Sequence, residues 1–212
     1  MAVDAFLVLS DMQGNPITGE SQDAVFSQVN AIEIFDFDFE ASKNAELEGE
    51  EEESGPVRSM ADDDADSFFA SLVNAAELYR DTAHDSFTFS IKKMLDLSSP
   101  HLFHSFCQTL QGSGKKKIKF TFAEAKVYLC RAGFKRDATK KPDDVAFMVL
   151  HFEDLYVTKY ALKLDTGLNV PDEDIDFFFQ KYKMGYRPQA TTGGFTTKLR
   201  YLGFDFLEDK KL

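Results

Sequence analysis

The sequence predicts a mainly β domain, a closed β-barrel or tight two-sheet sandwich, with one flanking α-helix and an acidic insertion that carries a short helix. Two long runs carry this prediction. Residues 145–164 place apolar side chains on both parities, which is typical of a strand covered on both faces. Residues 175–189 keep one parity from Ile175 to Phe179 and change it at Tyr182, as a bulge or a sharp bend at a barrel corner would require. Strands this long favour a closed sheet, because a long open edge invites aggregation.

The remaining strands follow from the same alternation of apolar and polar residues. The 22 Phe and 7 Tyr residues also favour strands. Within 32–40, three phenylalanines alternate with three carboxylates, whereas Ile32 and Ile34 occupy the opposite parity, so we expect a bulge near Ile34. The further expected strands are 5–9, 86–93, 118–130 and 198–207.

One core helix is predicted over about 98–111. Ser99 is a good N-cap and Pro100 suits the first helical position. Gly112 is placed to end the helix. One apolar stripe follows helical spacing and consists of Leu102, Phe103, Phe106, Cys107 and Leu110.

An acidic insertion over 42–84 interrupts the single barrel domain that we expect over 1–212. It holds 12 acidic and 3 basic residues, a net of −9 in a chain whose formal net charge is −12. Like-charge runs of this kind are usually solvated. Apolar residues at helical spacing follow Ser67, a suitable N-cap, so we predict an amphipathic helix over about 67–80. This helix has no partner in its own segment, so it either packs on the barrel wall or binds a neighbour.

The composition excludes several classes of protein. A nucleic-acid-binding surface needs clustered Lys and Arg residues. The net charge of −12 therefore argues against nucleic-acid binding. Cys107 and Cys130 cannot form a disulfide framework, so we expect folding in a reducing cytoplasm. The first ten residues lack the features of a cleavable signal peptide, and no stretch is long enough to span a membrane, so we expect no membrane insertion.

No group of residues reaches the standard of a catalytic, cofactor-binding or metal site. Asp36, Asp38 and Glu40 lie on one face of a strand, where carboxylates usually form a solvated surface rather than an acid–base pair. His101 and His104 flank the apolar stripe that contains Cys107, and no fourth zinc ligand is near in sequence.

A lysine run follows the predicted helix. It is a solvated hairpin end or a contact for an acidic segment of a neighbour, and its members are Lys115, Lys116 and Lys117.

Taken in order, several segments resemble the haemolysin-coregulated protein (Hcp) family, the inner-tube proteins of type VI secretion systems. Tyr186-Arg187-Pro188-Gln189 ends one such segment, and Phe204 stands where the family usually has Trp in its Gly-Trp-Asp ending. The insertion at 42–84 is longer and more acidic than the loop usually found there. The segments that carry the resemblance are 1–7, 19–23, 87–102, 125–133, 149–160, 173–189 and 203–211.

The resemblance implies a structural, non-enzymatic subunit without cofactors. Copies would close into hexameric rings that stack into a tube. A contractile sheath would fire the tube, which lies beneath a VgrG-like spike protein, and the baseplate would be a further partner. The lumen would hold effector proteins. The protein would be made in the bacterial cytoplasm and secreted to the extracellular space or a target cell without a cleavable signal peptide.

Two sets of residues are assigned to this assembly as hypotheses. Asp36, Asp38 and Glu40 form the candidate wetted or lumen face. The candidate inter-subunit or ring-stacking contacts are Phe68, Phe69, Leu72, Tyr79, Lys115, Lys116 and Lys117.

Two other functions compete with the tube subunit. The first is a non-polymerising cytoplasmic adaptor or chaperone that binds cargo through the acidic insertion. The second is a small hydrolase or effector fused to a tube domain, which we disfavour because 43 inserted residues are too few for a catalytic domain.

Overall fold

The computed structural model divides the chain into two compact units, Met1–Phe39 with Thr88–Leu212, and Glu40–Phe87. Of the second unit only the end residues are described, so the predicted helix at 67–80 lies outside the described part. Within that part, no helix has the length and hydropathy needed to cross a membrane. The described residues are 2–40, 87–110, 120–133, 135–164, 170–188, 195, 198–205 and 210–211.

The first unit is a mainly antiparallel β structure with one long helix, which confirms the predicted fold class. Its strands are β1 (Val3–Asp11), β2 (Ile32–Ile34), β3 (Asp36–Glu40), β4 (Thr88–Met94), β5 (Phe122–Arg131), β6 (Met148–Lys163), β7 (Asp172–Tyr186), β8 (Arg200–Asp205) and β9 (Lys210–Lys211). The helices are η1 (Phe26–Val29), α2 (Ser99–Leu110) and α3 (Pro142–Val145).

The sheet nearly closes on itself through the segment that contains β2 and β3. The strand order is β2-β1-β5-β6-β7-β4-β3, with β8 added beside β7. Because β2 and β3 are consecutive pieces of one segment at the two ends of this order, they join its ends. The break between them is Phe35, whose N–H donates to the carbonyl of Lys92 at 2.9 Å. The predicted bulge near Ile34 is this break.

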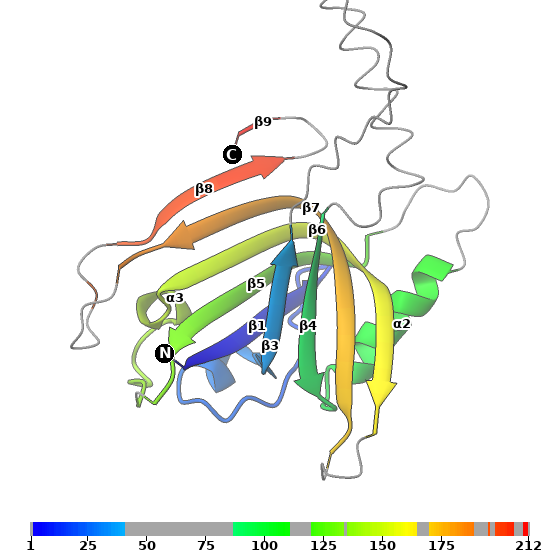
Figure 1. Cartoon of the computed structure of the whole chain (residues 1–212), viewed down its shortest axis with the longest axis horizontal. Coiled ribbons are helices and arrows are strands. Elements are labelled where there is room, and N and C mark those ends of the chain that lie inside the picture. The colour runs from blue at the N-terminus through cyan, green and yellow to red at the C-terminus, as the bar shows by residue number, and fades with distance from the viewer. Residues whose placement is uncertain are drawn as a thin grey trace, which may run out of the picture. The chain divides into compact units, whose positions relative to one another are not determined.

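A sharp bend crosses β5, β6 and β7 at one level (Figure 1). Asp154, in the middle of the bend, has φ 57°. At this level, successive inward-facing side chains on each strand are three residues apart rather than the usual two. On one side of the bend the paired inward residues are Phe122, Leu155 and Phe179, and on the other side they are Ala125, Phe152 and Tyr182. The parity change that the sequence shows between Phe179 and Tyr182 is therefore a barrel corner shared by three strands.

An aromatic cluster fills the barrel interior. The ring of Phe89 stacks on Phe152 and Phe177 with centroids 4.4 and 4.8 Å apart. Phe37 and Phe39 reach the same cluster from β3. Offset aromatic packing of this kind adds to the free energy of burial.

Two coverings, one outside the barrel and one on its inner face, bury apolar side chains along β6. On one side, Phe26 of η1 stacks on Phe6 with centroids 4.0 Å apart, within a cluster that includes Val149. At the other end of β6, α2 packs on the inner face of the sheet: the Phe103 ring lies 5.2 Å from the ring of Tyr160, and Tyr160 pairs with the inward-facing Ile175.

Three details differ from the predictions. The carbonyl of Ser98 accepts the N–H of Leu102, so Ser98 rather than Ser99 is the N-cap of α2. The expected strand starts late, at Met148 rather than at residue 145, because the residues before it form α3, for whose start Pro142 is suited. The short elements η1, α3 and β9 carry too few residues for periodicity to reveal them.

Candidate functional site

The acidic face of β3 lies where its alternation places it. Asp36 and Asp38 are exposed, while Phe37 and Phe39 contact the aromatic core. The Asp36 carboxylate accepts a hydrogen bond from Lys92 Nζ. The side chain of Glu40 lies outside the described residues. The described carboxylates therefore form a solvated row, partly neutralised by a lysine.

The candidate contact residues lie outside the described part of the chain. They remain predictions from the sequence: Phe68, Phe69, Leu72, Tyr79, Lys115, Lys116 and Lys117.

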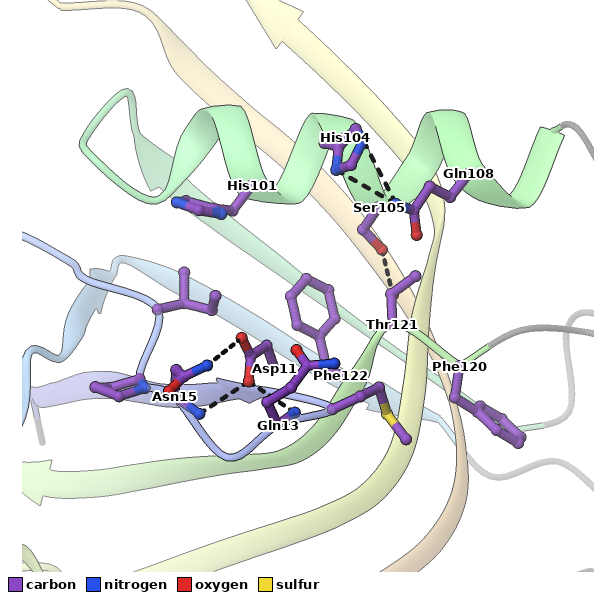
Figure 2. Close-up of a pocket in the computed structure, with 13 residues that line it drawn as sticks. Asp11, Gln13, Asn15, His101, His104, Ser105, Gln108, Phe120, Thr121 and Phe122 are labelled. Atoms are coloured by element: carbon purple, nitrogen blue, oxygen red, sulfur yellow. Dashed lines mark hydrogen bonds between the residues drawn. The ribbon is translucent and has the colours of Figure 1, made fainter.

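A hollow of about 340 Å³ lies between α2 and the loop that follows β1 (Figure 2). Ser105 Oγ and Thr121 Oγ1 are hydrogen-bonded to each other at 2.5 Å. Figure 2 shows the His104 ring turned toward Gln108, 3.4 Å away, rather than toward Ser105. The hollow thus contains no serine–histidine pair of the kind that nucleophilic catalysis requires. The lining residues are Asp11, Met12, Gln13, Asn15, Pro16, Ile17, His101, His104, Ser105, Gln108, Phe120, Thr121 and Phe122.

The histidines of α2 were the candidates for a metal site. In the part of the chain that the structure describes, no three His, Cys, Asp or Glu side chains are grouped as a metal ion would require. His101 and His104 are exposed, and Cys107 is half-buried.

Charged side chains alternate on the side of β5, β6 and β7 that faces away from the core. His151 Nε2 lies 2.7 Å from Glu124 Oε1, without the alignment of a hydrogen bond. Lys126 binds Glu124 at 2.7 Å and Lys183 binds Glu153 at 3.0 Å. Burial lowers the pKa of His151, although Glu124 opposes the shift. His151 is therefore largely neutral at pH 7, and the lysines and carboxylates around it pair with one another.

A buried polar cluster lies where β4 meets α2. Lys93 and Glu173 are fully buried, with Lys93 Nζ 2.5 Å from Glu173 Oε2. Lys93 Nζ also lies 2.8 Å from Asp96 Oδ1 and donates to Ser99 Oγ at 3.0 Å. Glu173 accepts further hydrogen bonds from Ser99 and from the Tyr160 hydroxyl. Burial and this bond to Glu173 raise the pKa of Tyr160. The cluster fixes the start of α2 to the β4–β7 pair.

Sequence reasoning missed this cluster, although a signal was present. Lys93 shares the parity of Phe89 and Ile91, both of which are buried. A lysine on a buried parity implies a buried partner.

Several exposed apolar side chains, also missed, lie at one end of the barrel, on both faces of the sheet and on α2. Figure 1 shows the ends of β4 and β6 and the start of β7 close together there. We call these seven large side chains the end patch. They are Met94, Leu95, Leu97, Phe103, Leu162, Leu164 and Val170.

Known structures share this fold. Scans of protein-family models and of curated proteins find no match to the sequence. The solved structures that match the fold include a type six secretion system protein (20% identity, TM-score 0.61, 100% of both chains) and Hcp1 from Salmonella typhimurium (17%, 0.58, 100% of both). They also include the secreted protein Hcp3 from Pseudomonas aeruginosa (10%, 0.51, 97% of this chain and 99% of that one). At these identities the likeness shows the fold alone. The described part of the chain has the Hcp fold.

Proposed function

We propose that this protein is a structural subunit of a type VI secretion inner tube. Copies close into hexameric rings, and the rings stack into a tube that sheath contraction expels. The observation that carries the proposal is the likeness to Hcp structures over 97–100% of this chain.

The described residues favour a structural role over catalysis. The polar groups around α2 are used for internal hydrogen bonds, and Ser105 is bonded to Thr121 rather than to a base. The charged row on β5 to β7 pairs with itself. These features suit a wall rather than an active site.

Within the tube, we assign the acidic row of β3 to the wetted or lumen side. Asp36 and Asp38 are exposed and their neighbours in the strand face the core, which supports a solvated position. We also assign ring contacts to the 67–80 helix and to the lysine run at 115–117. Deleting 42–84 should then weaken stacking while the barrel stays folded, and unchanged stacking would refute this role.

The partners follow from the same proposal. They are further copies of the chain, the contractile sheath, a VgrG-like spike, the baseplate and effector proteins in the lumen. Export to the extracellular space or a target cell is supported by the Pseudomonas aeruginosa neighbour, which is described as secreted.

Size-exclusion chromatography with negative-stain imaging of the purified full chain tests the proposal. Rings with an open centre are expected. A persistent monomer that binds other cell proteins through residues 42–84 would favour the adaptor function instead, since that segment carries a net charge of −9.

A further inference from the structure

His151 lies in the middle of the sheet, on the face of β6 that turns away from the barrel core. Its side chain is only 16% exposed. Lysines stand directly opposite it on both neighbouring strands, Lys126 on β5 and Lys183 on β7. Like charges directly opposite each other on neighbouring strands destabilise a sheet. The row of three is therefore stable only while the imidazole between the two lysines is neutral.

Two glutamates balance the two lysines. Glu124 binds Lys126 at 2.7 Å, and Glu153 binds Lys183 at 3.0 Å. We call these four residues and His151 the histidine cluster. It holds two positive and two negative charges while His151 is neutral, and a proton on His151 adds a third positive charge that no carboxylate within the cluster balances.

The strands on either side supply no spare carboxylate among the described residues. On β1 the positions paired with Glu124 and Lys126 are uncharged. On β8, Asp205 lies 3.9 Å from Lys181, a lysine that also contacts Asp154 at 3.1 Å. The positions that face the histidine cluster from β1 and β8 are Val8, Ser10, Gly203 and Asp205.

One carboxylate oxygen of Glu124 is shared between two neighbours. Glu124 Oε1 lies 2.7 Å from Lys126 Nζ and 2.7 Å from His151 Nε2. The contact with Nε2 lacks the alignment of a hydrogen bond. Because hydrogen bonds between two charged groups are roughly twice as strong as neutral ones, a proton on His151 draws this oxygen toward the imidazolium and away from the lysine.

We propose that the histidine cluster is an acid-sensitive switch, in which protonated His151 takes Glu124 from Lys126 and releases that lysine to solvent. The side-chain pairing between β5 and β6 changes on this outward face, and the face gains one positive charge. Burial lowers the pKa of His151, although Glu124 opposes the shift, so the switch responds on the acidic side of neutral pH. The inference goes beyond the proposed function and does not depend on it, because all of the groups lie in one copy of the chain.

Urea unfolding of the full chain at pH 7.5 and pH 5.0 tests the switch. Lys126→Met should lower the midpoint at pH 7.5 by about 0.1–0.4 M, as expected for a partly exposed pair. At pH 5.0 the same replacement should leave the midpoint unchanged or raise it, because the lysine has lost its partner. In a His151→Gln background, Lys126→Met should lower the midpoint at both pH values.

The control is Lys159→Met, since Lys159 lies 3.3 Å from Asp174 on β7, outside the histidine cluster. It should have the same effect at both pH values. Burial opposes it, yet the bonds from nearby lysines hold the pKa of Glu124 and of Asp174 below the usual values, so both carboxylates stay ionised at pH 5.0. A loss of effect in acid at Lys126 alone therefore reports on His151.

Histidine-selective NMR of the wild-type chain gives a second readout, with the His151 signal identified from its absence in His151→Gln. The signal should titrate between pH 7 and pH 5. An equal effect of Lys126→Met at both pH values in the wild type, or a His151 signal that does not titrate before the chain unfolds, would overturn the inference. Neither result would affect the proposed function, and a chain that stays monomeric would contradict that function while leaving the switch intact.

Discussion

The buried pair between Lys93 and Glu173 gives the sharpest stability prediction. Replacing Lys93 with Met keeps most of the buried side-chain volume but leaves Glu173, fully buried, without a cation. Breaking one partner of a buried ion pair costs about 3–5 kcal/mol. The hydrogen bonds that Ser99 and Tyr160 donate to Glu173 remain, so we expect the lower end of that range.

The neighbouring residue supplies a matched control. Lys92 also binds a carboxylate, that of Asp36, but both side chains are about half exposed, at 41% and 52%. Lys92→Met should therefore change stability little, since solvent screens an exposed pair. The two lysines are adjacent in β4, so strand propensity and position are nearly the same.

Urea unfolding followed by far-ultraviolet circular dichroism measures the difference, with each variant compared in the same assembly state. With m near 2–3 kcal/mol per molar, Lys93→Met should lower the midpoint by about 1 M urea or more. The double variant Lys93→Met with Glu173→Gln should cost less than the two single changes added, by roughly 1–3 kcal/mol, because no unpaired charge is left. Equal midpoints for Lys92→Met and Lys93→Met, or strictly additive changes, would refute the reasoning.

Three further predictions concern single residues. The pKa of His151 is lower in the folded state than in the unfolded chain, so the unfolded chain binds more protons as the pH falls from 7 to 5, and the free energy of unfolding drops. His151→Gln should therefore reduce this dependence of stability on pH, whereas the control His101→Gln should keep it. Urea midpoints measured at each pH would show the difference. A Cβ on Gly19 would lie 2.3 Å from the Ala31 carbonyl oxygen, so Gly19→Ala should destabilise by about 1–3 kcal/mol, and an unchanged melting temperature would count against this packing. Burial raises the pKa of Cys130 to about 12, so a thiol reagent at pH 8 should label the half-buried Cys107 first and Cys130 only after unfolding; equal labelling of both would contradict the structure.

The sequence predicted the strands well because each face of a strand has its own solvent environment. The alternation of β3, the break at Phe35 and the corner after Phe179 all follow from side-chain parity. What it could not predict depends on tertiary contacts. The four-residue η1 has no periodicity to detect and is held by the stacking of Phe26 on Phe6.

The end patch shows where reasoning from the sequence fails at the surface. Leu97 and Leu164 are apolar, and a sequence gives an apolar residue no sign that it is exposed. Their exposure follows from the inward turns of Asp96 and Ser98 and from the position of the β6–β7 connection at the barrel end. The acidic row of β3 was easier to predict, because its exposure follows from alternation alone.

Native mass spectrometry of the purified full chain tests the central claim most directly, because it counts the copies in each particle. The tube function predicts a main species of six copies of the 24.0 kDa chain, with larger species in multiples of six as concentration rises. A single copy at every concentration, or a dimer that grows no further, would contradict it.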